Sequence, residues 1–237
     1  MIVSAIPAFD DNYIWAIQPS ETNGVIVVDP GAAEPVLDWL TQHHKKLLGI
    51  LVTHHHWDHT NGIMPLVNLF QVPVIGPHGD HIEGISHAVT HGDTVTVPGT
   101  NCEFKVLATP GHTLDHLSYY TLGHVFVGDT LFSAGCGRMF EGTPEQFYQS
   151  LQCLAELPDD TNVYSAHEYT LANLKFALAA EPENNMIQDY LAAVTRRRAQ
   201  GLITLPSSIG REKQVNPFLR ATSAQQFAEL RRWKDQF

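Results

Sequence analysis

The run THHHWDH at residues 53–59 constrains this chain more than any other stretch of its sequence. It directly follows the apolar residues Ile-Leu-Val, which have the β-branched character of a buried strand. In an extended segment the side chains of residues i and i+2 point the same way, so His54 and His56 can bind one ion. Asp58 and His59, at the start of the next predicted helix, can turn towards a second. Imidazoles with one carboxylate suit zinc, iron or manganese, whereas calcium takes more oxygen ligands.

Three further potential ligands, His112, Asp129 and His167, come shortly after the ends of other predicted strands. Loops at the carboxyl ends of strands are where mixed α and β folds gather their sites. A His-rich surface loop is the simpler interpretation of the first run. It does not explain why metal-type residues recur at several strand ends.

The pattern of apolar residues predicts a mixed α/β region followed by helices alone. β-branched stretches bounded by Gly, Pro or Asp predict strands at residues 2–6, 13–17, 25–28, 50–52, 72–75, 94–97, 104–108, 117–121, 125–127 and 162–165. Helical periodicity marks residues 34–43, 60–70, 144–157 (with Thr143 as N-cap), 171–178, 187–198 and 224–234. We therefore predict a domain at residues 1–169 and a small all-helical domain at residues 170–237.

Charge and cysteine content narrow the classes of partner and compartment. The formal net charge of −11 repels phosphate backbones and disfavours nucleic acid as a partner. Cys102, Cys136 and Cys153 are too irregularly spaced for a disulfide framework or a CxxC zinc site, which indicates a reducing compartment. The sequence has neither a membrane-spanning apolar run nor a signal peptide. We expect a cytoplasmic protein that does not bind membranes and is a monomer.

The order HxHxDH, then His, then Asp, then His resembles the metallo-β-lactamase superfamily. The resemblance implies an αβ/βα sandwich that binds two divalent metal ions. Zn²⁺ is the expected ion, and Fe and Mn are alternatives. One ion would take His54, His56 and His112, and the other Asp58, His59 and His167. Asp129 would bridge both ions, because two nearby cations need anionic charge between them. A bridging hydroxide would complete both shells.

Further stretches are similar to the glyoxalase II family within that superfamily. They are AFDDNY at residues 8–13, GCGRMFEG at 135–142, HEYT at 167–170, and the helical tail with REK at 211–213 and NPF at 216–218. The resemblance then spans the whole chain. It implies that a metal-bound hydroxide hydrolyses S-(2-hydroxyacyl)glutathione thioesters, for example S-D-lactoylglutathione to D-lactate and glutathione. This reaction is the second step of methylglyoxal detoxification.

The same resemblance assigns roles to individual residues. It implies Asp58 and Asp129 as catalytic carboxylates, and it implies that glutathione is held by Arg138, Phe140, Tyr169, Arg211 and Lys213. Phe140 departs from the pattern, because some members carry Tyr there and a phenyl ring has no hydroxyl. The basic residues also make independent sense, since a strongly acidic protein needs local cations to hold an anionic tripeptide.

Other functions remain open from the sequence alone. A mononuclear iron persulfide dioxygenase shares much of the motif and also uses a glutathione derivative, and a non-catalytic metal-binding protein is a further alternative. A β-lactamase is disfavoured by the missing signal peptide. A nuclease is disfavoured by the acidic charge. The helical tail and His167 in its full context favour the two-metal hydrolase.

Several residues near the motifs have competing interpretations. Asp29 could orient a ligand histidine or simply form the turn before Pro-Gly, and the sequence favours neither. Cys136 has no evident base partner and is expected to be a packed small residue rather than a nucleophile. His55 points away from its neighbours in an extended chain, and His81 has no motif context. We expect His55 to lie at the surface or to support the ligands from outside the coordination shell, and His81 to be a surface or structural residue.

Overall fold

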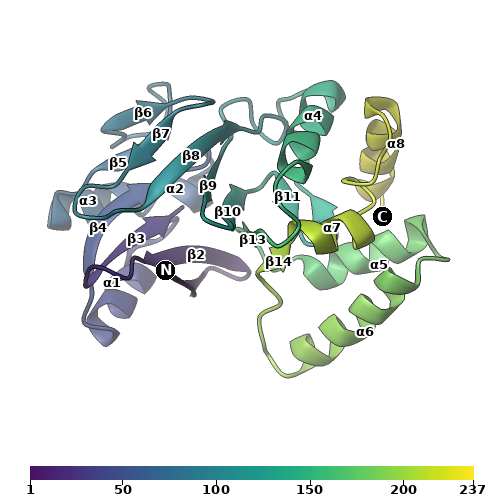
Figure 1. Cartoon of the computed structure of the whole chain (residues 1–237), viewed down its shortest axis with the longest axis horizontal. Helices are drawn as coiled ribbons and strands as arrows, with labels where there is room; N and C mark the ends of the chain where they lie inside the picture. Colours follow the sequence, from purple (N-terminus) through teal and green to yellow (C-terminus); the bar gives the residue numbers. More distant parts are fainter. The chain divides into compact units, whose positions relative to one another are not determined.

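The computed structural model describes all 237 residues and divides them into two compact units (Figure 1). Unit 1 comprises Met1–Ala108 and Asp115–Leu122, and unit 2 comprises Thr109–Leu114 and Gly123–Phe237. This division differs from a boundary after residue 169, which stays a prediction. Strands and helices occur in both units.

Unit 1 contains a six-stranded sheet in the order β1-β2-β3-β4-β5-β6. Its strands are β1 (Ile2–Ala8), β2 (Asn12–Gln18), β3 (Gly24–Val28), β4 (Lys46–Leu51), β5 (Val74–Pro77) and β6 (His87–Val89). β1, β2 and β3 pair antiparallel, whereas β3, β4, β5 and β6 pair parallel. The helices of this unit are α1 (Ala33–Gln42), α2 (Trp57–Thr60) and α3 (Ile63–Phe70).

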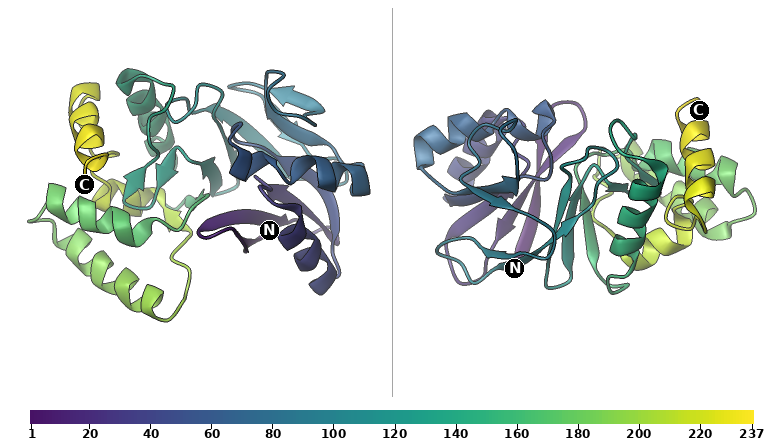
Figure 2. Two further views of the ribbon diagram at one scale, coloured as in Figure 1. Left: turned by 180° about the vertical axis from the view of Figure 1, so that it is seen from behind. Right: turned by 90° about the horizontal axis from the view of Figure 1, so that it is seen from above.

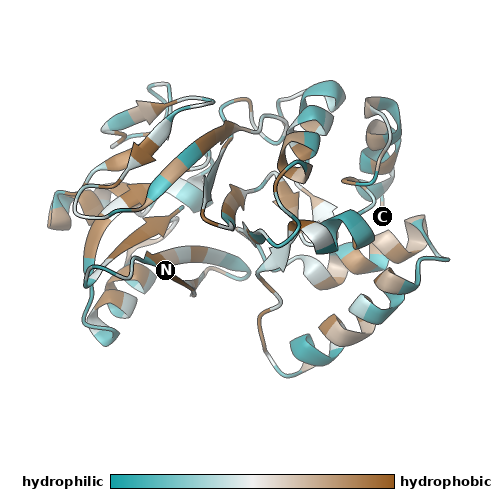
Figure 3. Cartoon of the chain, viewed as in Figure 1, coloured by the Kyte–Doolittle hydropathy of each residue, from teal (hydrophilic) through white to brown (hydrophobic).

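Alternate residues of these strands face α1 and α3. Val25, Val27 and Ile50 belong to the same buried cluster as Trp39 of α1 and Leu66 of α3. The intervening strand residues are buried too, which is why the strands read as continuous apolar runs in the sequence (Figure 3). Burial of a side chain of this kind contributes about 1.5–3 kcal/mol. The two buried faces therefore determine the register of the sheet.

Unit 1 also contains an antiparallel ladder of β7 (Thr94–Thr96), β8 (Glu103–Ala108) and β9 (Leu117–Thr121). Tyr119 of β9 is fully buried, and its hydroxyl donates to the carbonyl oxygen of Val52 at 2.7 Å. This bond ties β9 to the segment that follows β4. The start of the His-rich run is thereby anchored.

Unit 2 pairs β10 (His124–Gly128) with β13 (Asn162–Ser165) in parallel, and β13 with β14 (Ser207–Ser208) antiparallel. A short hairpin joins β11 (Leu131–Phe132) and β12 (Gly135–Cys136). The helices are α4 (Pro144–Ala155), α5 (Thr170–Ala180), α6 (Asn185–Ala199), α7 (Ile209–Val215) and α8 (Ala224–Lys234). α5 and α6 pack against each other, and the left view of Figure 2 shows them side by side.

Apolar side chains of the helices in unit 2 pack on the hairpin and on one another. Leu174 of α5, Ile187 of α6 and Val215 of α7 share a buried cluster with Ala134 of the hairpin. The rings of Phe147 in α4 and Phe227 in α8 lie 5.3 Å apart between centroids. The helical tail thus shares its core with the strands of its own unit.

The predicted fold class is confirmed, and the differences concern short elements. Sequence patterns missed β6, β11, β12, β14 and α7, because segments of two or three residues show no period and α7 is only seven residues long. The helix expected at residues 60–70 begins later, as α3 at Ile63, and a separate short helix, α2, lies before it at Trp57–Thr60. The chain turns at Gly62, where a Cβ would lie 2.4 Å from the carbonyl oxygen of Pro30. None of the helices has the length and apolar character needed to cross a membrane.

Candidate metal centre

Two parallel strands in unit 1 bring Asp29 next to the His-rich run. Asp29 follows β3, and Thr53 follows the neighbouring β4. The Asp29 carboxylate accepts from the backbone N–H of Thr53 and from its hydroxyl, both at 2.7 Å. Both residues are buried. Hydrogen bonds to a carboxylate in such surroundings are stronger than those between neutral groups, so the start of the run is held firmly.

These bonds also set the tautomers of two histidines. His59 Nδ1 lies 3.0 Å from Asp29 Oδ2 and donates to it. The Thr53 hydroxyl already donates to Asp29, so it accepts from His54 Nδ1 at 3.0 Å. In both rings the hydrogen therefore sits on Nδ1, and Nε2 keeps the lone pair with which imidazole binds a metal.

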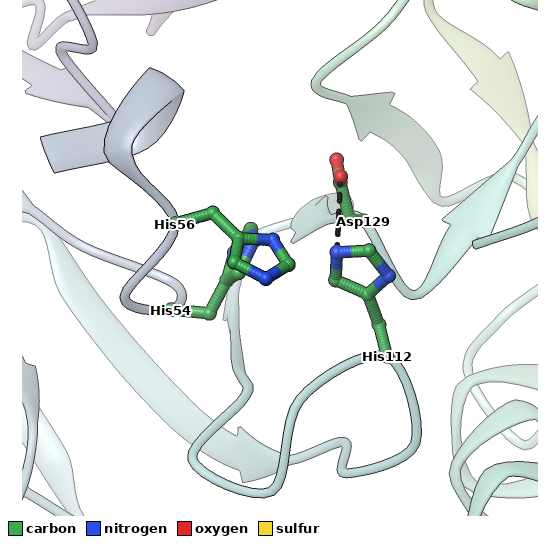
Figure 4. Close-up of side chains that lie close together, drawn as sticks. All are labelled: His54, His56, His112 and Asp129. Atoms are coloured by element: carbon green, nitrogen blue, oxygen red, sulfur yellow. Dashed lines mark hydrogen bonds and ion pairs between the residues drawn. The ribbon is translucent and has the colours of Figure 1, made fainter. Parts of the chain in front are cut away.

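The remaining side chains of the run lie close to these two rings. His54 Nε2 is 3.0 Å from His56 Nδ1, as their i and i+2 spacing allows, and Figure 4 shows the two rings from adjacent backbone positions. His59 Nε2 is 3.5 Å from Asp58 Oδ2. Asn12 Nδ2 donates to the same Asp58 oxygen at 2.9 Å. Unit 1 thus gathers three imidazoles and one oriented carboxylate.

Unit 2 gathers the other three predicted ligands. Asp129 follows β10 and His167 follows β13, and because these strands are parallel, their carboxyl ends meet. Asp129 Oδ1 lies 3.4 Å from His167 Nε2, and Asp129 Oδ2 lies 3.3 Å from His112 Nε2 (Figure 4). All three residues are buried. One carboxylate therefore faces two imidazoles, one through each of its oxygens.

The segment after β12 supports this arrangement. His112 Nδ1 donates to the carbonyl oxygen of Arg138 at 2.7 Å, which again leaves Nε2 with the lone pair. Gly137 lies against the Asp129 backbone, and a Cβ at this position would be 2.0 Å from the Asp129 carbonyl oxygen and 3.1 Å from His112 Nδ1. Any side chain at residue 137 would displace both neighbours.

The donor set fits divalent transition-metal ions. Unit 1 offers three imidazoles and the Asp58 carboxylate, and unit 2 offers two imidazoles and the Asp129 carboxylate. Hydrogen bonds at Nδ1 prepare Nε2 of His54, His59 and His112 for ligation. Mixed nitrogen and oxygen ligands of this kind suit Zn²⁺, Fe and Mn. Two carboxylates also supply the negative charge that a pair of dications needs.

Three of the residues predicted to bind substrate lie beside ligands of unit 2. Tyr169 stacks on His167, with ring centroids 4.8 Å apart and planes 4° apart, and is 37% exposed. Phe140 is 59% exposed, and its ring centroid is 5.2 Å from that of His112. The Arg138 guanidinium lies 5.9 Å from the Phe140 ring centroid. Exposed side chains next to the predicted metal ligands are suitably placed to contact a molecule that enters from solvent.

The other two predicted residues lie on α7. The Arg211 guanidinium sits 4.6 Å from the ring centroid of Tyr190. Lys213 Nζ is 2.6 Å from Asp159 Oδ1, and Asp159 precedes β13, whereas His167 follows it. Lys213 therefore lies towards the end of β13 opposite His167. Its role in substrate binding stays a prediction.

Sequence reasoning missed two residues that support the candidate centre. Asn12 donates a hydrogen bond to Asp58, which lies 46 residues away in sequence. Arg231 of α8 is buried and donates to the carbonyl oxygens of Cys136 and Gly137 at 3.1 and 3.3 Å, directly before Arg138. An arginine in a tail rich in charged residues carries no local signal of this role.

Comparisons with known proteins show which families this chain resembles. The family model described as "Metallo-beta-lactamase superfamily" matches residues 8–167, and the one described as "Hydroxyacylglutathione hydrolase C-terminus" matches residues 168–237. A hydroxyacylglutathione hydrolase of Idiomarina loihiensis is 57% identical over 220 residues, covering 93% of this chain and 86% of that protein. One from Vibrio cholerae is 49% identical over 252 residues, with 99% of both chains covered. The crystal structure of ETHE1 from Myxococcus xanthus superposes with a TM-score of 0.75 at 29% identity, covering 98% of this chain and 90% of that one.

Proposed function

Because the chain belongs to the hydroxyacylglutathione hydrolase family of the metallo-β-lactamase superfamily, we propose that it hydrolyses S-(2-hydroxyacyl)glutathione thioesters at a dinuclear metal centre. It is an enzyme, a thioester hydrolase. S-D-lactoylglutathione is the substrate we propose, with D-lactate and glutathione as products. This would place the enzyme at the second step of methylglyoxal detoxification.

The two ions would be held by the seven residues of the family motif. His54, His56 and His112 would bind one ion, Asp58, His59 and His167 the other, and Asp129 both. When bound, two Zn²⁺ ions supply Lewis acidity, which lowers the pKa of a water to about 7 and polarises the thioester carbonyl. The carboxylates of Asp58 and Asp129 offset the positive charge, and Asn12 orients Asp58 through its 2.9 Å hydrogen bond.

The observation that carries the proposal is the position of the Asp129 carboxylate. Its two oxygens lie 3.3 and 3.4 Å from Nε2 of His112 and of His167, which the motif assigns to different ions. A carboxylate that bridges two ions needs this arrangement, in which each oxygen faces a proposed ligand of a different ion.

Substrate recognition would use exposed residues of unit 2. The Arg138 side chain is 61% exposed and can pair with a carboxylate of glutathione, and Tyr169 and Phe140 offer partly exposed rings next to His167 and His112. Arg211 and Lys213 would add positive charge from α7. The acidic balance of the protein, −11, makes such local cations necessary for holding an anionic tripeptide.

The proposal is tested by replacing the bridging carboxylate. Purified, metal-replete protein is incubated with S-D-lactoylglutathione, and loss of the thioester is followed together with the metal content. We expect Asp129→Ala to abolish hydrolysis and to loosen both ions, whereas Asp160→Ala, at an exposed aspartate after α4, leaves both unchanged.

Retained hydrolysis with full metal content in Asp129→Ala would reject the assignment. A cephalosporin and glutathione persulfide with oxygen serve as parallel substrates. Oxygen uptake with the persulfide, without loss of the thioester, would move the protein to the dioxygenases.

We further propose a domain boundary after residue 169, a cytoplasmic location and a monomeric state. The two family models meet at residues 167 and 168, which supports the boundary. None of the three cysteines forms a disulfide bond, which supports a reducing compartment. Light scattering of the purified protein tests the monomer, and a molecular mass of twice 26.3 kDa would contradict it.

A further inference from the structure

A second cluster of ligating side chains lies in unit 1, outside the seven residues of the proposed centre. His55 Nδ1 is 3.0 Å from Asp115 Oδ1, and His81 Nε2 is 3.0 Å from Asp115 Oδ2. One ligand atom from each of the three residues lies within 4.8 Å of those of the other two. The rings of His55 and His81 stand nearly perpendicular, at 87°, with centroids 5.2 Å apart.

Three separate segments bring these side chains together. His55 lies between two predicted ligands but points away from them, as alternation along an extended segment requires. His81 belongs to the loop between β5 and β6, and Asp115 directly precedes the end of β9 that adjoins the His-rich run. Asp115 is 60 residues from His55 and 34 from His81 in sequence. The pattern of a metal motif was therefore not visible in the sequence.

We propose that His55, His81 and Asp115 form an additional binding site for a divalent transition-metal ion, with Zn²⁺ as the best chemical match. Two imidazoles and one carboxylate are a set that zinc accepts, with bonds of about 2.0–2.2 Å and a fourth position left to water. Ligand atoms at tetrahedral corners are then about 3.3 Å apart. The two 3.0 Å separations run to different oxygens of Asp115, and one ligand atom from each residue lies within 4.8 Å of the others. The side chains therefore need to close around the ion by at most about 1.5 Å.

Metal binding changes the hydrogen positions in both rings. In the metal-free form each ring donates a hydrogen to Asp115 from the nitrogen that faces it. On binding, each ring carries its hydrogen on the other nitrogen, and the lone pair of the facing nitrogen goes to the ion. The ion takes the place of the two bridging hydrogens.

Exposure and charge make the site accessible to a cation. The side chains of His55, His81 and Asp115 are 27%, 46% and 11% exposed, so the site opens to solvent at His81. The carboxylate at its centre is the least exposed of the three, which strengthens its attraction for an ion. A bound ion would link the β5–β6 loop to the run that carries the proposed catalytic ligands.

The test counts ions in the full-length protein. Wild type, His81→Gln and His78→Gln are dialysed against buffered Zn²⁺ at micromolar free concentration, and zinc per chain is measured by mass spectrometry. His78 is an exposed histidine near the same loop and serves as the matched control. We expect three ions per chain in wild type and in His78→Gln, and two in His81→Gln, which should retain its thioesterase activity.

A second variant and a spectrum keep the result independent of folding. Asp115→Asn should also lose one ion, and cobalt-loaded wild type should show a tetrahedral absorption component that is absent from His81→Gln. A third ion missing from wild type, or retained in His81→Gln, would overturn the proposal and leave a purely hydrogen-bonded cluster. Failure of the proposed function would instead show as absent thioester hydrolysis in wild type, whatever the ion count.

Discussion

At Asp29 the two interpretations left open by the sequence are both realised. Its φ of 53° places it in the left-handed region, as a turn before Pro-Gly requires. Its carboxylate also holds the Thr53 N–H and His59 Nδ1. Asp29 therefore forms the turn and also fixes the ring of His59, a proposed metal ligand.

Replacing Asp29 with Asn should weaken metal binding. An amide nitrogen in place of one oxygen would face the N–H of Thr53 or of His59, so at least one of these hydrogen bonds is lost. Loss of such a partner lowers metal affinity about 10–100-fold. Competition with a chromophoric chelator measures the change. Asp38→Asn, at an exposed position of α1, is the control, and equal affinities of the two variants would contradict the role.

The Cys136 thiol should be unreactive in the native protein. It is buried in contact with the Arg231 guanidinium, and burial raises the pKa of Cys136 to about 11. The reactive thiolate is therefore scarce at pH 8. Mass spectrometry after treatment with a thiol reagent should show label on Cys102 or Cys153 and none on Cys136 until the protein is denatured. Rapid labelling of Cys136 in native protein, or loss of hydrolysis in Cys136→Ala, would restore it as a candidate nucleophile.

The ligands were predictable residue by residue, and their supporting partners were not. His54, His56 and Asp129 follow strands, and both the period of two and the convergence of strand ends are local rules. Asn12 and Arg231 act across 46 and 95 residues of sequence, and no local pattern encodes such a contact. For the same reason the sequence did not predict that Asp115 contacts His55 and His81.

At the scale of elements, α7 is joined to the β11–β12 hairpin through Glu212. This carboxylate is fully buried and accepts from Ser133 Oγ, Ala134 N and Asn216 Nδ2 at 3.0, 2.7 and 3.0 Å, and also from Ser207 Oγ. Burial raises the pKa of Glu212, and the four donors oppose this rise. Asn216 in turn donates to carbonyl oxygens of the hairpin.

Glu212→Gln should destabilise the protein, and the loss should depend on pH. The side-chain amide nitrogen of the glutamine is a donor and would face one of the four donors that now bond to Glu212. We therefore expect the free energy of unfolding to fall by about 1–3 kcal/mol. Because the folded pKa of Glu212 is raised, its contribution is complete below the unfolded value of 4.5 and declines as the pH rises through the folded pKa. The difference between wild type and variant should therefore shrink with rising pH. Urea unfolding between pH 5 and pH 8 measures it, and a difference that grows would refute this account.

Long elements with clear signals were predictable, and short ones were not. Thr143 caps α4 in a full capping box with Gln146, as the sequence of this helix indicates. β11 and β12 have two residues each, and Glu212 and Asn216, which are distant in sequence, bond to the hairpin that they form. The helix predicted from residue 60 begins only at Ile63, because the chain turns at Gly62, and the four-residue α2 before it is too short to show a period.

At the scale of the whole molecule, metal binding should contribute to folding stability. An ion that binds only the folded state stabilises it by about 4 kcal/mol when its free concentration is a thousand times its dissociation constant. For a chain of 237 residues, removing one such ion should lower Tm by about 8–16 °C. Calorimetry before and after chelation tests this, with chelator preloaded with Zn²⁺ as the control. An unchanged Tm in metal-free protein would contradict the coupling.

The tie between Arg231 and the segment before Arg138 has a consequence for biosynthesis. Translation adds about 5–20 residues per second, so the 95 residues that separate Cys136 from Arg231 take about 5–20 s to make. The nascent chain already contains His112 when this interval begins, and Arg138 follows two residues after Cys136. The carbonyl oxygen of Arg138 accepts a hydrogen bond from His112 Nδ1. The guanidinium that restrains this segment has not yet been synthesised. During synthesis, His112 and the segment that accepts its hydrogen bond are therefore made before Arg231, the residue that restrains this segment.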